Sequence, residues 1–81
     1  MVNLEAKTKL SPEEVASKLK KFFGKGGWGL DLTEETAQCI TFEGGGGYVT
    51  ATLCPEEGKT RVNLVIQEWD YQVKEFLSGL S

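Results

Sequence analysis

The sequence predicts an α+β domain with a five-stranded, mostly antiparallel sheet and two helices on one face, in the order β-α-β-β-β-β-α. Three observations indicate this order. A strongly signalled helix start at Ser11 follows a strand-like segment, four more strand-like segments come next, and a second helical pattern opens near Asp70. The 81 residues leave room for one domain, which we expect to span residues 1–81.

The first strand and the first helix are predicted by local patterns. Residues 2–10 alternate apolar and polar side chains, which is typical of a half-buried strand. Ser11 is the expected N-cap, Pro12 suits the first helical position, and Glu14 can complete a capping box. The glycine-rich segment 24–27 is expected to end the helix. The apolar stripe that should face the core consists of Val15, Leu19, Phe22 and Phe23.

The middle of the chain predicts a second strand over 28–32, a turn over 33–36 and a hairpin of strands 37–43 and 48–54. The two strands of this hairpin flank four consecutive glycines. Alternation places two sets of side chains on opposite faces. The inner set is Ile40, Phe42, Val49, Ala51 and Leu53, and the outer set is Cys39, Thr41, Tyr48, Thr50, Thr52 and Cys54.

The last third predicts a turn over 55–58, a strand over 61–67 and a closing helix. Val62, Leu64 and Ile66 should point inward, with Val65 outward. Asp70 is the expected N-cap of the helix. Its apolar stripe follows the spacing i, i+3, i+4 and i+7, and consists of Val73, Phe76, Leu77 and Leu80.

Composition excludes several kinds of chemistry. The chain has no histidine, so it lacks the usual general base and the commonest metal ligand. Its net charge is −3 and it holds a single arginine, which argues against nucleic acid. No apolar run reaches the roughly 20 residues of a membrane span. We therefore expect a non-catalytic, cytoplasmic protein without catalytic residues, metal or cofactor, and without nucleic-acid or membrane partners.

Two local features remain open to more than one interpretation. Cys39 and Cys54 follow no metal or redox spacing and are expected as free thiols. They would face each other directly if Gly46 and Gly47 formed the hairpin tip, but would lie two residues out of register if Gly45 and Gly46 did. The run Gly44, Gly45, Gly46 and Gly47 is followed by a strand with no nearby basic residue, so a flexible hairpin loop is expected and not a phosphate-binding loop.

The element order resembles one half of the TATA-box-binding protein fold, and also the core of the helix-grip (Bet v 1/START) superfamily. The segment Gly58-Lys59-Thr60-Arg61-Val62-Asn63-Leu64, with Trp69-Asp70 and the closing helix, is similar to the end of many helix-grip proteins. The first resemblance implies DNA on the bare sheet face, but the predicted face lacks a positive field. The second implies an apolar ligand between sheet and helix. Neither resemblance carries over a catalytic residue.

These observations predict a small module that acts by contact with a protein partner or with a second copy of itself, through its outer sheet face or an exposed edge strand. The expected interaction face comprises Tyr48, Thr50, Thr52, Arg61, Asn63 and Val65. A marginal core in so short a chain would gain from covering this second face. The alternative is a reduced helix-grip domain that binds a small apolar ligand through Trp28, Phe42, Leu64, Trp69 and Phe76.

Overall fold

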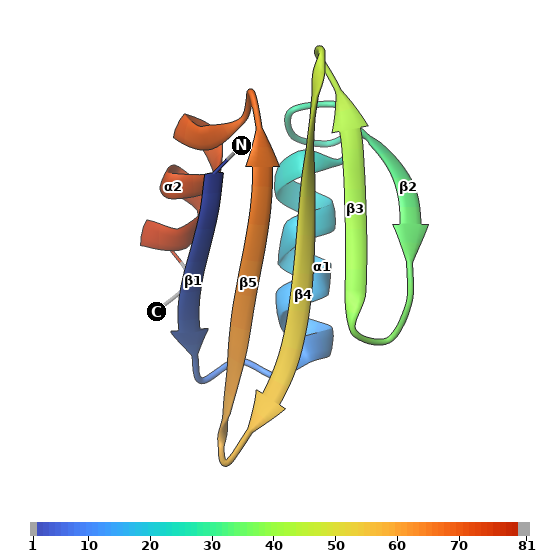
Figure 1. The fold of residues 1–81 in the computed structure, drawn as a ribbon. Helices are drawn as coiled ribbons and strands as arrows, with labels where there is room; N and C mark the ends of the chain where they lie inside the picture. Colours follow the sequence, from blue (N-terminus) through green and yellow to red (C-terminus); the bar gives the residue numbers. More distant parts are fainter. Residues whose placement is uncertain (1, 80–81) are drawn as a thin grey trace.

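The structure of the protein, a computed structural model, describes residues 2–79 and confirms the predicted α+β class and element order (Figure 1). All neighbouring strands pair antiparallel, in the spatial order β1-β5-β4-β3-β2. The elements are β1 (Val2–Thr8), α1 (Pro12–Phe23), β2 (Asp31–Glu35), β3 (Cys39–Gly44), β4 (Gly47–Glu56), β5 (Lys59–Gln67) and α2 (Asp70–Ser78).

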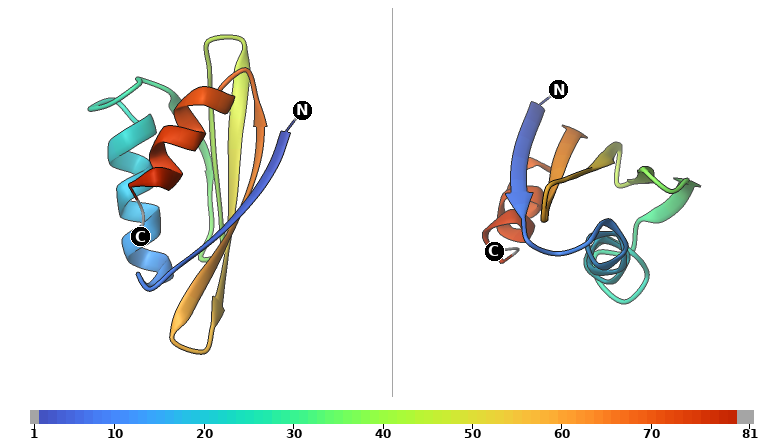
Figure 2. Two further views of the ribbon diagram at one scale, coloured as in Figure 1. Left: turned by 90° about the vertical axis from the view of Figure 1, so that its left-hand side faces the viewer. Right: turned by 90° about the horizontal axis from the view of Figure 1, so that it is seen from below.

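Both helices cover the same face of the sheet, and the opposite face is bare over the described residues (Figures 1 and 2). We call the bare side the outer face. One sheet and one helical layer make a two-layer domain with a single core between them. An antiparallel sheet tolerates such a solvated side because its side chains alternate between the two faces.

The core confirms the alternation predicted for the three central strands. Phe23 of α1 lies at the centre, with its ring centroid 5.8 Å from that of Phe42 and 6.0 Å from that of Phe76. Each fully buried aliphatic or aromatic side chain contributes about 1.5–3 kcal/mol. The buried apolar side chains are Val15, Leu19, Phe23, Leu30, Ile40, Phe42, Val49, Ala51, Leu53, Val62, Leu64, Ile66, Val73 and Phe76. Phe22, expected to face the core, is only half-buried between the helices.

The start of α1 confirms the predicted capping box. The Glu14 backbone N–H donates to Ser11 Oγ at 3.2 Å, and the Ser11 N–H donates to Glu14 Oε1 at 3.3 Å. Pro12 occupies the first helical position, where its missing N–H costs nothing. The helix ends at Gly24, whose N–H donates to the Lys20 carbonyl at 2.9 Å.

The predicted second strand is present, but its bounds, 28–32, and those of the turn after it, 33–36, are wrong. The chain leaves α1 through a wide turn in which the Trp28 N–H donates to the Phe22 carbonyl and the Leu30 N–H to the Phe23 carbonyl. These bonds hold residues 28–30 against the helix end, so β2 begins only at Asp31. A bulge between Leu32 and Glu34 interrupts the alternation that the prediction assumed. The turn to β3 falls at residues 36–38.

Other element ends also differ from the prediction. β1 stops at Thr8, two residues early. Pro55 belongs to β4 and not to a turn, because the turn after it is reduced to Glu57 and Gly58. The Leu53 N–H points toward β3 and donates to the Gln38 carbonyl, just before that strand begins. The nitrogen of Pro55, two residues later, points to the same side but lies beyond the end of β3. A proline without an N–H is tolerated where the neighbouring strand has already ended.

The start of α2 corrects the expected N-cap. Trp69 occupies that position, with no side-chain capping bond, and Asp70 is the first helical residue. Asp70 still places a negative charge in the first turn, where the helix dipole favours it. Val73 and Phe76 are buried as predicted, and Leu77 packs against the core. The expected stripe residue Leu80 lies outside the described residues.

Candidate interaction surface

The six residues predicted as an interaction face lie together on the outer face. In the register of β4 and β5, Thr50 pairs with Val65 and Thr52 with Asn63. Tyr48 lies at one end of β4, while Arg61 pairs with Cys54 toward the other end. All six side chains are half-buried because each leans on its cross-strand neighbours. No element of the described chain covers them.

Two residues of β3 extend this surface. Cys39 pairs with Thr52 and Thr41 with Thr50, and Oγ1 of Thr41 lies 3.2 Å from Oγ1 of Thr50. The sequence alternation had already placed Cys39 and Thr41 on this face, although they were not among the predicted interaction residues. We call the resulting uncharged area the central patch. It consists of Cys39, Thr41, Thr50, Thr52, Asn63 and Val65.

A basic corner lies at one end of the central patch, beside the β4–β5 turn. Lys7 of β1 pairs with Arg61, and Lys59 pairs with Glu56 across the turn. Arg61 and Lys7 both form ion pairs with Glu56, at 4.0 Å for Lys7. Glu5 lies two residues before Lys7 on the same face. The basic corner consists of Lys7, Lys59 and Arg61, and Glu56 neutralises part of it.

An acidic corner lies diagonally opposite. Asp31 of β2 pairs with Glu43 of β3 near the β3–β4 turn, and Glu34 pairs with Thr41. Paired residues of an antiparallel ladder point to the same side, so Asp31, Glu34 and Glu43 all lie on the outer face. None of the ion pairs among residues 2–79 involves these three carboxylates. The outer face is therefore uncharged at its centre, with opposite charges at opposite corners.

The ion pair between Glu56 and Arg61 shifts the pKa of both groups. A hydrogen bond from the Arg61 guanidinium lowers the pKa of the Glu56 carboxyl below its ordinary value of 4.5. Partial desolvation opposes this change, and the charges of Arg61 and Lys7 add to it. The same hydrogen bond raises the pKa of Arg61. Both groups are thus charged at neutral pH.

The hairpin register decides between the two cysteine arrangements. Gly44 pairs with Gly47, so Gly45 and Gly46 form the tip. Cys39 then lies opposite Thr52 and is two residues out of register with Cys54. Both thiols are free, and Cys39 Sγ donates to Glu34 Oε1 at 3.8 Å.

The glycines at positions 44–47 do not share one structural role. Gly45 and Gly46 have φ of 61° and 84°, as a two-residue hairpin turn requires. A Cβ at position 47 would lie 2.0 Å from the Gln67 carbonyl oxygen, so Gly47 permits close contact between strands. Gly44 and Gly47 belong to the strands and not to a loop. The flexibility expected of this run stays a prediction.

The five residues of the apolar-ligand alternative do not line one cavity. Phe42 and Leu64 are each 1% exposed and pack in the core, and Phe76 is 7% exposed. Trp69 is half-buried at the end of the sheet, and Trp28 lies 47% exposed outside the core. The space between sheet and helices is occupied by the protein's own side chains. This alternative therefore stays a prediction from sequence.

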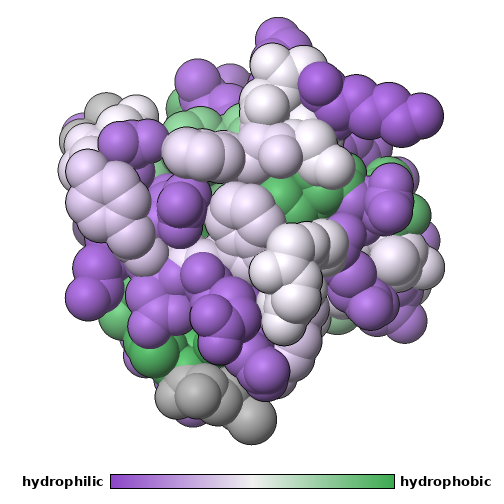
Figure 3. Space-filling view, turned by 90° about the horizontal axis from the view of Figure 1, so that it is seen from above, coloured by the Kyte–Doolittle hydropathy of each residue, from purple (hydrophilic) through white to green (hydrophobic). Residues whose placement is uncertain are grey.

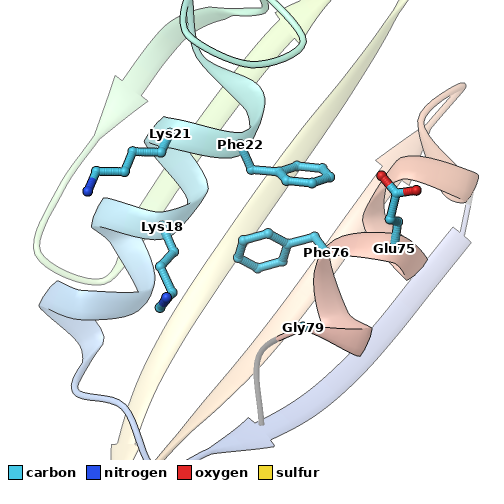
Figure 4. A pocket seen from close by; sticks show the side chains of 6 residues that line it. All are labelled: Lys18, Lys21, Phe22, Glu75, Phe76 and Gly79. Atoms are coloured by element: carbon cyan, nitrogen blue, oxygen red, sulfur yellow. The ribbon is translucent and has the colours of Figure 1, made fainter.

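The structure instead has an open groove of about 380 Å³ between the two helices (Figure 4). The rings of Phe22 and Phe76 lie between the helices, with centroids 5.3 Å apart. Lys18 and Lys21 come from α1, while Glu75 comes from α2. Gly79, the last described residue, also lines the groove. Of the predicted ligand residues, only Phe76 takes part.

Two further properties concern the part of the chain that the structure describes. Within residues 2–79, no helix has the length and apolar character that crossing a bilayer requires. Across the same residues, no group of three or more cysteine, aspartate or glutamate side chains has a geometry suited to a metal ion.

Comparison with protein-family models, curated proteins and solved structures finds no match for this chain. The resemblances to the TATA-box-binding protein half and to the helix-grip superfamily thus stay predictions from element order. The candidate site rests on the geometry of the outer face.

Proposed function

We propose that this protein is a non-catalytic interaction module that forms a homodimer through its outer sheet face. The observation that carries the proposal is the uncharged central patch between a basic and an acidic corner. Protein–protein interfaces have the same anatomy, because charged groups are depleted from the desolvated centre and remain on the hydrated rim. Threonine methyl groups and Val65 supply apolar area for such a centre, and Tyr48 adds to it at one end of β4.

The size of the face limits how much area a dimer can bury. The described chain measures 36 × 20 × 18 Å, so two faces whose strands cross at a large angle overlap over about 400 Å² at the centre, which is at the low end of specific interfaces. A small domain gains more from such burial than a large one does, since its single core is limited. In the dimer, the outer faces of the two sheets would pack against each other and form a second core that both copies share.

The sheet edges are less suited to self-association than the face. The edge strand β2 is short, carries three acidic side chains in five residues and contains a bulge. Charges and bulges at an edge prevent pairing with another strand. The other edge strand, β1, carries Glu5 and Lys7. Contact through the outer face avoids both edges.

The charge pattern favours one arrangement of the two copies. The two copies can be related by a two-fold axis that lies in the plane of the interface and runs along the diagonal without charged corners. This axis places the basic corner of each copy over the acidic corner of the other. In that arrangement the strands of the two sheets cross at a large angle, which is the orthogonal class of sheet packing. Isologous contacts of this kind close the assembly at two subunits.

Sedimentation velocity and native mass spectrometry at increasing protein concentration test the proposal. Asn63→Lys places a charge in the central patch and should abolish the dimer. Ser17→Lys adds the same charge on the exposed side of α1 and should leave the dimer unchanged. A Kd of about 1 mM corresponds to little binding free energy for a pair of proteins. A protein that stays monomeric up to that concentration would therefore contradict the proposal. Equal effects of the two variants would also do so.

Charge exchange tests the orientation. Lys7→Glu and Glu43→Lys should each weaken the dimer, because each sets like charges opposite each other at both symmetry-related contacts. The double variant should regain much of the affinity of the original protein. Melting curves of the single variants at low concentration control for effects on the monomer, since Lys7 also pairs with Glu56. Additive losses in the double variant would rule out the diagonal arrangement.

We also propose a cytoplasmic location. Free Cys39 and Cys54 support it, because small domains of oxidising compartments commonly pair their cysteines. Fractionation of the source cells with a tagged chain tests this proposal. Recovery of the protein in an oxidising compartment would contradict it.

A further inference from the structure

Two tryptophan side chains are in contact at one end of the sheet. The β3–β4 turn and the β5–α2 connection form this end. The ring centroids of Trp28 and Trp69 lie 5.9 Å apart, and their planes make an angle of 64°. We call this pair the aromatic corner. Seen from this end, the surface has a pale zone of intermediate hydropathy among hydrophilic side chains (Figure 3). Trp28 and Tyr71, at this end, are two of the three large apolar side chains that residues 2–79 expose.

Trp69 is held in place by the glycine turn. Its indole N–H donates to the Gly44 carbonyl at 2.8 Å. A Cβ at position 45 would lie 2.7 Å from Trp69 Cζ2, so the ring lies against the turn only because residue 45 is glycine. The ring therefore has few alternative positions. A preorganised aromatic side chain loses little conformational entropy when it binds a partner.

Trp28 is positioned by the second glycine-rich segment. Its backbone N–H donates to the Phe22 carbonyl at 3.0 Å. A Cβ at position 27 would lie 2.0 Å from that same carbonyl oxygen, and Gly29 has φ of 80°. These glycines let the chain turn sharply enough to bring Trp28 against Trp69. Both glycine-rich runs of the sequence thus converge on the aromatic corner.

The residue before Trp69 is conformationally unusual. Glu68 has φ of 71°, the one positive φ outside glycine among residues 2–79. A side chain in this left-handed region costs of order 1 kcal/mol or more, and such positions cluster at binding sites. Here it directs the chain from β5 into α2 with Trp69 turned toward the β3–β4 turn. The aromatic corner is thus formed at a cost in local backbone energy.

The surroundings of the aromatic corner are acidic. Glu68 and Asp70 flank Trp69 in the chain and line a shallow depression of about 460 Å³ together with Tyr71. Glu43, which precedes Gly44, and its ladder partner Asp31 are also close along the chain, but their side chains belong to the acidic corner of the outer face. None of these four carboxylates takes part in an ion pair among the residues described. Along the chain, Lys25 and Lys74 are the nearest basic residues.

From this arrangement we propose that the aromatic corner binds an arginine side chain in an extended basic segment of a partner protein. The guanidinium would lie on the exposed face of Trp28 against Trp69, where the negative π-faces attract a cation. Glu68 and Asp70 would accept hydrogen bonds from the arginine or from a neighbouring basic residue. This site lies at the end of the sheet and does not depend on dimerisation through the outer face.

The charge of the surroundings selects this ligand among those that stack on tryptophan. A neutral sugar or a proline-rich segment could use the same rings, but would gain nothing from the carboxylates of Glu68 and Asp70. An acidic segment would be repelled by them. A basic segment gains from both features, and its association should weaken as salt is added.

The test uses the full chain and a capped peptide of alternating glycine and arginine. The control is the same peptide with citrulline, which keeps the size and shape of arginine but has no charge. Tryptophan fluorescence and the two indole N–H resonances in nitrogen-edited NMR spectra report binding. We expect the arginine peptide to shift both indole resonances and the citrulline peptide to bind at least tenfold more weakly. Equal binding of both peptides, or a Kd for arginine above about 5 mM, would overturn the proposal.

Variants separate the rings from the charges. Trp28→Leu should weaken binding of the arginine peptide by roughly three- to tenfold, whereas Trp28→Phe keeps a ring and should stay within about twofold. The Glu68→Gln, Asp70→Asn double variant should bind more weakly at low salt and lose most of the salt dependence. Unchanged binding by Trp28→Leu, with a native circular dichroism spectrum, would overturn the proposal. Should that variant fail to fold, the peptide pair and Trp28→Phe still decide the question.

Discussion

The indole N–H of Trp69 donates a 2.8 Å hydrogen bond to the backbone carbonyl of Gly44, a residue 25 positions earlier in the chain. This bond joins the start of α2 to the β3–β4 turn, two segments that local sequence signals treat as unrelated. The N-cap residue of α2 makes no side-chain bond to its own helix, and its indole N–H, a donor, is used for this tertiary bond instead. The position of α2 at this end therefore depends on a tertiary contact.

Replacing Trp69 should show the strength of this contact. Trp69→Phe removes the donor and leaves a part-buried carbonyl without its partner, which costs about 1–3 kcal/mol of unfolding free energy. Trp28→Phe removes a similar group at an exposed position and should cost less than about 0.5 kcal/mol. Urea unfolding followed by circular dichroism measures both. Equal losses would show that the indole–carbonyl bond does not stabilise the fold.

The two tip glycines provide a matched comparison. Both have positive φ, so alanine at either position costs about 1–2 kcal/mol of backbone strain. Position 46 has open space around a Cβ, but position 45 would also press on Trp69 Cζ2 at 2.7 Å. Gly45→Ala should therefore destabilise the protein more than Gly46→Ala in thermal unfolding. The reverse order would mean that Trp69 does not rest on the turn.

Thr60 offers a test of a buried polar contact. Its side chain is 1% exposed and its Oγ1 donates to the Leu10 carbonyl at 2.7 Å, which ties β5 to the segment before α1. Thr60→Val keeps the shape but leaves that carbonyl unpaired, so about 1–3 kcal/mol should be lost in urea unfolding. Thr52→Val, on the outer face, serves as the control and should be nearly neutral in the monomer. A neutral Thr60→Val would show that water replaces the hydroxyl.

The Glu56–Arg61 pair predicts a specific dependence on pH. Because the folded protein lowers the pKa of Glu56, the pair contributes stability that is fully present above the unfolded value near 4.5. That contribution disappears as pH falls through the lower folded value. Glu56→Gln should therefore reduce the melting temperature at pH 7, and the difference from the original protein should shrink toward pH 3. Its neighbour Glu57, exposed in the turn, provides the control Glu57→Gln, for which we expect little difference at either pH.

A constant difference between Glu56→Gln and the original protein across this range would contradict the assignment. It would mean that the loss comes from packing of the side chain and not from its charge. The arginine partner should behave differently, because its raised pKa keeps it charged throughout. Arg61→Gln should consequently remove the acid dependence that Glu56 confers.

Local signals predicted some elements well because the interactions that form them are local. The Ser11, Pro12 and Glu14 pattern specifies a helix start within four residues, and the structure confirms each of its hydrogen bonds. The alternation of Val62, Leu64 and Ile66 with Arg61, Asn63 and Val65 is equally direct, since β5 is paired on both sides. A strand with two partners cannot shift without exposing its apolar residues.

The predicted bounds of β2 were wrong because non-local contacts decide where that strand begins. Trp28 and Leu30 have the spacing of a strand, but their backbone groups bind the end of α1. β2 is exposed along its whole length, so burial does not mark it in the sequence. It is held by the ladder to β3, by side-chain hydrogen bonds of Thr33 and Glu34 to β3, and by an ion pair from Lys20 of α1 to Glu35.

The sequence by itself determined the class of the fold, the order of its elements and the outer position of the central patch, because periodicity and capping act over a few residues. Only the tertiary structure decided the strand order, the hairpin register, the diagonal placement of the charged corners and the meeting of Trp28 with Trp69. Those features join residues that are distant in the chain. Their positions follow from how the helices and strands share one core, which no local pattern specifies.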